Sequence, residues 1–345
     1  MIPPFFTDQP AWLDKVGRIY ALLERLKISE ERTADLVRLR RANRISSVHS
    51  STAIEGNRLT LAQVSAVADG QSVYAPARDV TEVANALAAY DVLGSFDPCS
   101  VDDFLRAHGL LTRGLMAESG AFRTVEVAIV NADDEVLHTG SRPGKVPRLV
   151  AELFDWAGTA EQHPLVVSSA THYLIEHIHP FRDGNGRIGR LWQTLMLSRW
   201  NPLFEWMPTE TLIRRHQAGY YQALQDTHDP EVDAAPFVTF MLDIIEQSLR
   251  QYGDTTETSP ATPDDGVSDG ASDGVSGSGG LRLDALDRTI LARLAADETL
   301  TITQLASVTG KSPRTVERRL AKLTTASLVR RDGSDKTGVW VVTAP

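Results

Sequence analysis

The sequence predicts a mostly α-helical protein that ends in a small α+β domain. Over most of the first 252 residues, apolar side chains recur every three or four positions, which is typical of helices buried on one face. One stretch, residues 122–139, alternates as a β-hairpin does. A polar segment at 253–280 then precedes a last stretch with apolar stripes of its own. With 345 residues, the chain has room for two or three domains.

Eight helices are expected before the polar segment, because in each one the apolar residues share a single helical face. In the hairpin, Val125, Val127 and Ile129 alternate with polar residues, an Asn-Ala-Asp-Asp turn follows, and the strand pattern resumes at Val136. The expected helices cover residues 12–26, 31–44, 80–94, 145–156, 164–178, 187–200, 209–225 and 236–252.

Composition and charge exclude several classes of protein. A formal net charge of −10 argues against nonspecific nucleic-acid binding by the chain as a whole. The single cysteine, Cys99, excludes an internal disulfide and a structural zinc held by cysteines. The N-terminus lacks the features of a secretory signal, and no apolar run approaches the roughly 20 residues of a membrane span. A soluble, cytoplasmic protein with no membrane partner is therefore expected.

The segment 253–280 is expected to be a flexible acidic linker. It holds seven glycines, two prolines, six acidic residues and no basic residue. Such a segment cannot bury enough apolar surface to offset the entropy of ordering it. Residues 281–345, in contrast, hold eleven basic and seven acidic residues. The basic part of the chain thus lies alone at the C-terminal end.

Most of the residues suited to catalysis or anion binding lie in twelve consecutive positions between two amphipathic helices. Proline and a Gly-Asn-Gly triplet in this segment predict a tight loop that opens the second helix. Backbone N–H groups at the positive end of a helix dipole bind anions. The segment is His179-Pro180-Phe181-Arg182-Asp183-Gly184-Asn185-Gly186-Arg187-Ile188-Gly189-Arg190.

Four side chains of this segment suit phosphate chemistry. Arg187 and Arg190 share a helical face, so both guanidinium groups can point at one phosphate chain. Asp183 offers a hard oxygen ligand for Mg²⁺ shared with phosphates. His179 has a pKa range suited to a general base. The segment therefore predicts a nucleotide site.

Alternatives exist for these residues taken singly. His179 could cap the preceding helix, and Arg187 with Arg190 could form a solvated helix face. His172, His177 and His179 do not share one helical face, which disfavours a zinc site. His172 and His177 are instead expected to pack in the core or to support their neighbours.

The twelve residues match the pattern HPFx(D/E)GNGRxxR, so the chain resembles the Fic (filamentation induced by cAMP) family over roughly residues 30–250. The resemblance implies a helical Fic fold with a β-hairpin flap at 122–139 that binds the target. It also implies protein AMPylation, the transfer of AMP from ATP to a hydroxyl of a target protein, or of the chain itself, with release of pyrophosphate. The target and its modified residue are not identified by the sequence.

Under this resemblance, His179 would deprotonate the hydroxyl, Asp183 would hold Mg²⁺, and Arg187 and Arg190 would clamp the β- and γ-phosphates. The glycine-rich triplet would bind phosphate oxygens, and two tyrosines of the next helix would line the adenine side. The ATP-binding positions implied are Asp183, Gly184, Asn185, Gly186, Arg187, Ile188, Gly189, Arg190, Tyr220 and Tyr221. The alternative for the tyrosines is a place in the core.

Residues 51–57 (STAIEGN) resemble the (S/T)xxxE(G/N) inhibitory helix of autoinhibited members of the family. The resemblance implies that Glu55 pairs with Arg190 and holds the enzyme inactive, with Ser51 helping to fix the helix. The alternative is a helix that simply ends at Gly56. A carboxylate in a last helical turn is disfavoured by the helix dipole unless it meets a cation, which favours the inhibitory role.

Residues 281–345 resemble a winged helix-turn-helix domain. Two short helices precede a third that Ser312 can cap and Pro313 can begin, and a two-stranded wing follows. The third helix would present its basic residues to a DNA major groove, and the alternative is a module for protein contacts. The candidate DNA-binding residues are Arg314, Arg318, Arg319 and Lys322.

The expected domains are an N-terminal helical region (1–97), a catalytic core (98–252), the linker (253–280) and the winged helix (281–345). Besides an autoinhibited adenylyltransferase, two functions are considered. One is a DNA-binding regulator whose core senses nucleotide without turnover, and the other is a Fic enzyme with a different phosphate-containing donor. The oligomeric state is open, with a homodimer as one alternative.

Overall fold

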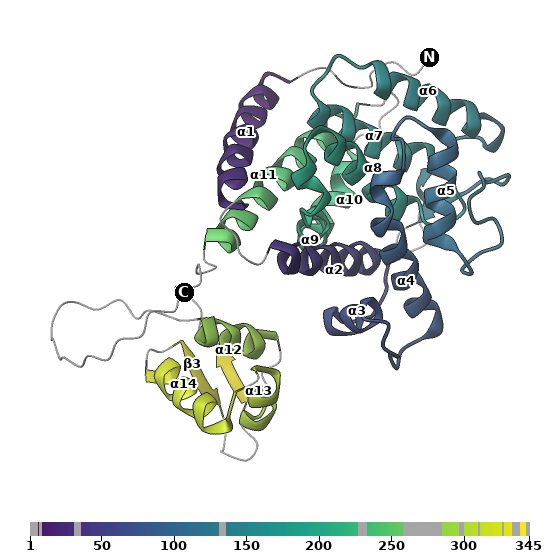
Figure 1. The fold of residues 1–345 in the computed structure, drawn as a ribbon. Helices are drawn as coiled ribbons and strands as arrows, with labels where there is room; N and C mark the ends of the chain where they lie inside the picture. The colour runs from purple at the N-terminus through teal and green to yellow at the C-terminus, as the bar shows by residue number, and fades with distance from the viewer. Residues whose placement is uncertain are drawn as a thin grey trace. The chain divides into compact units, whose positions relative to one another are not determined.

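The computed structural model describes residues 6, 9–30, 36–130, 136–226, 233–257, 285–296, 300–309, 311–325, 328–332 and 339–342. The chain divides into two compact units, Met1–Asp264 and Asp265–Pro345 (Figure 1). Each unit has a separate cluster of buried apolar side chains. None of the described helices is both long and apolar enough to cross a membrane.

Two buried helices form the centre of the first unit. α7 (Pro164–Ile178) and α8 (Asn185–Trp200) pack along each other, and most of their side chains are buried. α11 (Ala235–Glu257) packs on α7, and α1 (Pro10–Glu30) lies along α11, as Figure 1 shows. The loop that joins α7 to α8 is therefore held by a rigid pair of core helices.

Aromatic side chains fix two further helices on this centre. α5 (Val101–Thr112) contacts α8, and α6 (Val146–Thr159) contacts α7. The ring of Phe104 lies 5.2 Å from that of Phe154 and 5.0 Å from that of Trp192, in both cases edge to face. Edge-to-face contacts add to the free energy gained by burial, so this cluster anchors both helices.

The N-terminal region adds three helices. α2 (Leu36–Ile54) packs against α3 (Leu61–Ala68) and α4 (Ala77–Asp91). α3 begins at a capping box in which the Thr60 side chain accepts from the backbone of Gln63 and the Gln63 side chain accepts from that of Thr60. α2 therefore enters the fold as an element packed on several neighbours.

The expected helix at 209–225 is divided in two at His216. α9 (Thr209–Arg215) packs on α2, whereas α10 (Gln217–Gln225) packs on α11. The apolar pattern of the sequence continues through His216, so the break in the helix is attributed to tertiary packing rather than to the local sequence. Three short 3₁₀ turns complete the unit: Leu93–Ser95, Pro143–Lys145 and Pro202–Glu205.

Other helix boundaries differ from the expected ones. α2 continues ten residues beyond the predicted end at 44, so Ser51 lies inside it. α11 continues through 253–257, which were assigned to the linker, because Gly253 lies against Leu26 of α1 and no proline occurs before 260. α3 and α5 were not predicted. Residues 31–35 and the remainder of the linker lie outside the described residues.

The hairpin is shorter than predicted. β1 (Ala128–Val130) pairs antiparallel with β2 (Val136–Thr139), with an irregularity between Ile129 and Val130. Residues 122–127, which were also expected to be a strand, are not one. At the start of this stretch the N–H of Arg123 donates to the carbonyl of Pro180, and at its end the carbonyl of Val127 accepts from the N–H of Gly140, both at 3.1 Å. The predicted turn at 131–134 lies outside the described residues.

The second unit has the elements expected of a winged helix. α12 (Ala285–Ala296), α13 (Ile302–Thr309) and α14 (Pro313–Thr325) precede the antiparallel pair β3 (Val329–Asp332) and β4 (Val339–Val342). The Ser312 hydroxyl accepts from the backbone N–H of Thr315, as predicted for the cap of α14. The core consists mainly of Ile290, Leu294, Leu305, Val316, Leu320, Leu323, Val329 and Trp340. The prediction of a mostly helical protein with this small α+β domain is confirmed.

Because the two cores are separate, a chain that ends after Glu257 is expected to keep the unfolding midpoint of the first unit. As a control, a chain that ends after Ala234 lacks α11 and its buried Phe237, Leu242 and Ile245. This loss is expected to exceed the total stability of a domain, about 5–15 kcal/mol. Thermal unfolding followed by near-ultraviolet circular dichroism compares the two. If the chain that ends after Glu257 is molten, the first unit needs the second unit in order to fold.

Candidate active site

The loop between α7 and α8 is closed by its own side chains. The amide of Asn185 accepts from the backbone N–H of Phe181 and donates to its carbonyl, both at 2.9 Å. The ring of Phe181 is buried and stacks on that of His108, with 3.6 Å between the ring centroids. The Asn185 side chain thus shapes the loop rather than facing a ligand, and its backbone N–H is the group available to an anion.

His108 supports the loop from α5 in its neutral form. Its Nδ1 accepts from the backbone N–H of Gly120 at 3.1 Å, so the proton lies on Nε2, which is 3.0 Å from the carbonyl of Asp183. Burial lowers the pKa of His108 to about 4. Sequence analysis missed this residue, which acts only through the tertiary contact.

His179 occupies an unusual backbone conformation at the end of α7. Its φ of 52° makes it the one non-glycine residue with a positive φ among the described residues. Its carbonyl accepts from Nε of Arg123 at 2.6 Å. Arg123 also donates to the carbonyls of Val125, at 2.7 Å, and Ser141. Arg123 is 3% exposed and was missed by sequence analysis, yet it holds the backbone that aims the imidazole.

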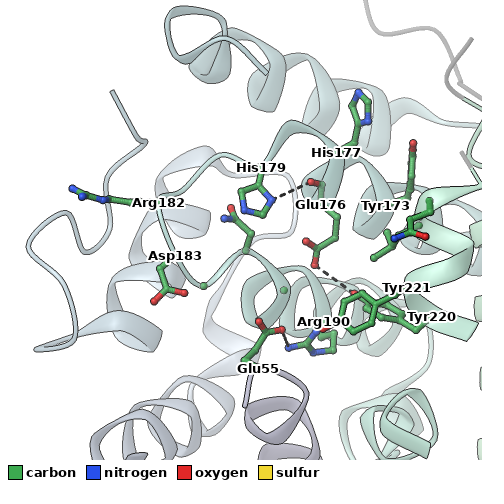
Figure 2. A pocket seen from close by; sticks show the side chains of 15 residues that line it. Glu55, Tyr173, Glu176, His177, His179, Arg182, Asp183, Arg190, Tyr220 and Tyr221 are labelled. Atoms are coloured by element: carbon green, nitrogen blue, oxygen red, sulfur yellow. Dashed lines mark hydrogen bonds and ion pairs between the residues drawn. The ribbon is translucent and has the colours of Figure 1, made fainter. Parts of the chain in front are cut away.

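A cavity of about 270 Å³ opens beside this loop. Figure 2 shows side chains of α7, α8, α10 and the turn after α2 that converge on it. Nine of the predicted site residues line it: Glu55, His179, Asp183, Gly184, Asn185, Gly186, Arg190, Tyr220 and Tyr221. Five others do not: Ser51, Gly56, Arg187, Ile188 and Gly189. The structure therefore gathers most, but not all, of the predicted site.

The N-terminus of α8 forms an anion-binding feature at the cavity, and a carboxylate lies against it. Gly184 precedes the helix with a φ of 86°, and Asn185 and Gly186 form its first turn. A Cβ on Gly186 would lie 2.3 Å from Oε1 of Glu55, so any side chain at this position would have to displace that carboxylate. Glu55 thus places its negative charge where the helix dipole favours an anion.

Arg190 is the cation that receives Glu55. Its Nη2 donates to Oε1 of Glu55 at 2.7 Å and to the carbonyl of Ser51 at 3.0 Å, and its Nε donates to the Ser51 hydroxyl at 3.0 Å (Figure 2). The Arg190 side chain is 1% exposed. Burial disfavours its charged form, but Glu55 together with Tyr220 and Glu176 outweighs burial and raises the pKa of Arg190. Its buried Nη1 has no hydrogen-bond partner among the described residues.

Arg187 does not point at the cavity with Arg190, contrary to the prediction. Its guanidinium lies between Glu82 of α4 and Asp183, with Nη2 at 3.1 Å from Oδ1 of Asp183. The helical spacing was correct, but a buried acid on α4 draws the side chain to the other side. Arg187 therefore orients Asp183.

Ile188 and Gly189 also have structural rather than ligand-facing positions. Ile188 is fully buried in the core. A Cβ on Gly189 would lie 2.8 Å from Cδ2 of His172 and 3.3 Å from Oε1 of Glu176. Gly189 is thus needed for the close approach of α7 and α8, and neither residue is placed to contact a nucleotide directly.

Asp183 is the one predicted metal ligand. Its carboxylate is half-exposed and accepts from Arg187 and from Nη2 of Arg78 at 3.2 Å. Within the described part of the chain, no group of three or more His, Cys, Asp or Glu side chains could hold a metal. Mg²⁺ commonly takes one or two carboxylates and completes its shell with waters and phosphates. A single carboxylate beside an anion-binding helix terminus fits that ion.

Two tyrosines and a buried acid line the opposite wall. Tyr220 is buried, and its hydroxyl lies 3.4 Å from Oε1 of Glu176 and 3.1 Å from Nε2 of His172. Tyr221 is partly exposed. Glu176 is 8% exposed and was not singled out from the sequence, although it stands only three residues before His179. Tyr220 is therefore both a core residue and a wall of the cavity.

The basic residues of the second unit lie on α14. Arg314 and Arg318 are exposed, whereas Arg319 is half-buried. The side chain of Lys322 lies outside what the structure describes. Two of the four predicted DNA contacts are thus available at the surface of this unit.

Comparison with known proteins agrees with this site. A family model described as the Fic/DOC family matches residues 98–197, and one described as an AsnC-type helix-turn-helix domain matches residues 283–324. The crystal structure of a Fic family protein from Desulfovibrio desulfuricans G20 is 34% identical, with a TM-score of 0.69, and the match covers 100% of this chain and 99% of that one. A structure of Fic-1 from C. elegans is 23% identical, with a TM-score of 0.56, over 72% of this chain and 75% of that one, and shows the fold alone.

Curated relatives match part of their length. Protein adenylyltransferase Fic of Culex quinquefasciatus is 29% identical over 234 residues, which cover 64% of this chain and 43% of that protein. Protein adenylyltransferase fic-1 of Caenorhabditis briggsae is 29% identical over 240 residues, 65% of this chain and 44% of that protein. The chain thus spans less than half the length of these two relatives.

Because Glu55 lies against Gly186, the effect of Gly186→Ala on the free energy of unfolding is expected to depend on Glu55. Gly186→Ala is expected to lower the free energy of unfolding by about 1–3 kcal/mol, as overpacking does. In a Glu55→Gly background this cost is expected to vanish, leaving a gain of about 0.5–1 kcal/mol from replacing a helical glycine by alanine. Urea unfolding of the four proteins measures both values. An equal cost in both backgrounds would show that Glu55 does not occupy this position in solution.

Proposed function

The chain belongs to the Fic/DOC family, and on this premise we propose that it transfers AMP from ATP to a hydroxyl side chain of a protein. The hydroxyl oxygen attacks the α-phosphorus, the bond to the β-phosphate oxygen breaks, and pyrophosphate leaves with the electron pair. The convergence of His179, Asp183, the α8 N-terminus and Arg190 on one cavity is the observation that carries the proposal. The names of the curated relatives support the same activity.

His179 is the proposed general base. Its Nδ1 lies 3.3 Å from the carbonyl of Glu176, a contact that favours the proton on Nδ1 and leaves the lone pair on Nε2. Nε2 can then accept the hydroxyl proton. Since Arg123 and the left-handed backbone hold the residue, little reorganisation is needed when the hydroxyl arrives.

The backbone N–H groups at the start of α8 and the guanidinium of Arg190 are the proposed phosphate-binding groups. The orientation of these groups is fixed before a ligand binds. Groups oriented in advance can stabilise the charge that develops in the transition state without reorganising. Mg²⁺ held by Asp183 would supply neutralisation of phosphate charge. Arg187 and Arg78 keep that carboxylate at the edge of the cavity.

We also propose that Glu55 inhibits the enzyme. Its carboxylate holds Arg190 and lies on the first turn of α8, so it takes two of the places that a polyphosphate would use. A triphosphate that still enters would be displaced, and a displacement of about 1 Å can cost on the order of 10²-fold in rate. The target protein, which can be the chain itself, is left open by these contacts.

Two other functions stay as alternatives. The cavity does not by itself select the nucleobase, so a different phosphate-containing donor would fit the same anion-binding groups. The AsnC-type helix-turn-helix match and the exposed Arg314 and Arg318 favour DNA binding by the second unit as an additional function.

Replacing the general base tests the proposed reaction. In a Glu55→Gly background, His179→Ala is expected to lower AMP transfer by about 10²–10⁴-fold and to leave ATP binding intact. The transfer is measured with α-labelled ATP and Mg²⁺, and the binding by isothermal titration calorimetry. His216→Ala, at an exposed histidine that does not line the cavity, is the matched control. Unchanged transfer by the His179 variant would exclude this residue as the base.

Releasing Arg190 tests the inhibition. Glu55→Gly is expected to raise the initial rate of AMP transfer by up to about 10²-fold, because the phosphates can then settle on Arg190. Arg190→Ala is expected to be slow with or without Glu55. Glu161→Gly makes the same change in the exposed segment before α7 and is expected to have no effect. Equal rates for Glu55→Gly and the unchanged protein would mean that residues 51–57 are only the end of a helix.

A further inference from the structure

A chain of buried polar groups runs from the core into the cavity. Nε2 of Gln193 donates to the Ser169 hydroxyl at 3.1 Å, and Oε1 of Gln193 lies 2.7 Å from Nδ1 of His172. Nε2 of His172 lies 3.1 Å from the Tyr220 hydroxyl, which lies 3.4 Å from Oε1 of Glu176. Tyr220 and Glu176, at the outer end of this chain of polar groups, line the cavity.

The inner end of the chain fixes the direction of its hydrogen bonds. The Ser169 hydroxyl donates to the carbonyl of Leu165 at 2.7 Å, so it accepts from the Gln193 amide. The Gln193 oxygen must then accept, and the proton of His172 lies on Nδ1. Burial lowers the pKa of His172 to about 3, so this imidazole is neutral and its Nε2 is an acceptor.

The hydrogen-bond directions at Tyr220 and Glu176, the outer end of the chain of polar groups, follow by elimination. Tyr220 has one hydroxyl proton, and the acceptor at Nε2 of His172 uses it. If the Tyr220 hydroxyl donated to Glu176 instead, Nε2 of His172 would be left without a donor, so in this arrangement the tyrosine oxygen accepts in its 3.4 Å contact with Glu176. A carboxylate has no proton to donate, whereas a carboxylic acid has one. For Tyr220 to donate to Glu176 while His172 donates to Tyr220, the Gln193 amide would have to be flipped. The hydrogen bond from the Ser169 hydroxyl to the carbonyl of Leu165 would then be lost.

We propose that Glu176 is a neutral carboxylic acid when an anion occupies the cavity, and that polyphosphate binding draws a proton onto it whenever it is ionised. The inference rests on the proposed function in one respect, namely that the anion is the phosphate chain of a nucleotide. Glu176 is thus a residue of the binding pocket whose protonation sets the affinity for that anion. Its backbone carbonyl is the group near Nδ1 of the proposed base, His179, whereas its carboxyl lies near the Tyr220 hydroxyl.

The surroundings of Glu176 explain why an anion has this effect. Burial and the charge of Glu55 raise the pKa of Glu176, whereas Arg190 of α8 and the contact with the Tyr220 hydroxyl lower it, and the result is about 7. Tyr220 of α10 and His172 of α7 are the other titratable groups in contact with it, and both are neutral near pH 7. A polyphosphate in the cavity adds its negative charge to that of Glu55, so it raises the pKa of Glu176 further.

The sign of the linkage follows from the two pKa values. Since the pKa of Glu176 is higher with the anion bound, the complex holds more protons than the free protein. Affinity for the anion therefore falls as the pH rises above about 7, by up to about tenfold for each pH unit until the pKa of the complex is reached. Replacing the carboxyl by an amide, which is always neutral and can donate to Tyr220, removes this dependence.

Infrared spectroscopy tests the protonation without any ligand or activity. Near pH 6 the intact protein is expected to show the carbonyl stretch of a buried protonated carboxyl, which Glu176→Gln lacks. Glu152→Gln, at a partly exposed acid of α6 whose pKa is lowered by Arg148, is expected to retain it. The band is expected to disappear as the pH is raised through about 7. A difference spectrum without this band would show that Glu176 is ionised and would overturn the proposal. This result stands whether or not the protein transfers AMP.

Calorimetry tests the coupling to an anion. ATP with Mg²⁺ is titrated at about pH 8, where the phosphates are fully ionised, in buffers of different ionisation enthalpy. The intact protein and Glu152→Gln are expected to take up close to one proton on binding, and Glu176→Gln close to none. Equal proton uptake by all three would overturn the linkage. Thermal unfolding checks that Glu176→Gln is folded, and if it is not, the pH titration of the infrared band in the intact protein decides.

Discussion

A buried guanidinium needs hydrogen-bond acceptors, and the arrangement of the cavity depends on the acceptors that Arg190 has. Ser51 supplies two and Glu55 supplies one, and both belong to the end of α2 and the turn after it. The side chain is 1% exposed, so an unpaired charge there would be costly. One cation thus joins the N-terminal region to the first turns of α8, and the acceptors that it holds decide what else can bind there.

The loop beside Arg190 is rigid for a separate reason. Its backbone polar groups are satisfied by side chains, since Asn185 closes it on itself and Arg123 and His108 hold it from outside. A site fixed in this way needs little reorganisation to bind a polyphosphate or to receive a proton at His179. The contact of Glu55 with Arg190 and the geometry of the loop are therefore built on different interactions.

Periodicity predicted α7 with its observed bounds, and the resemblance of residues 51–57 to an inhibitory helix implied the contact of Glu55 with Arg190 that the structure contains. The sequence did not predict that Arg187 turns away, since a helical face is readable from spacing but the acid of α4 that draws the side chain is a tertiary neighbour. Arg123 was missed for the same reason, as its stretch looks like a strand until its carbonyl partners are known. α5 could have been found from its serine cap and acidic first turn.

The central claim is that Arg190 binds either Glu55 or a phosphate chain. The most direct measurement is a pair of crystal structures with ATP, one of the unchanged protein and one of Glu55→Gly. In the variant, Nη2 of Arg190 is predicted to lie within hydrogen-bond distance of a phosphate oxygen, whereas in the unchanged protein it keeps Glu55 and the terminal phosphate lies elsewhere. A variant whose Arg190 remains bonded only to Ser51, with the phosphates out of reach, would contradict the account.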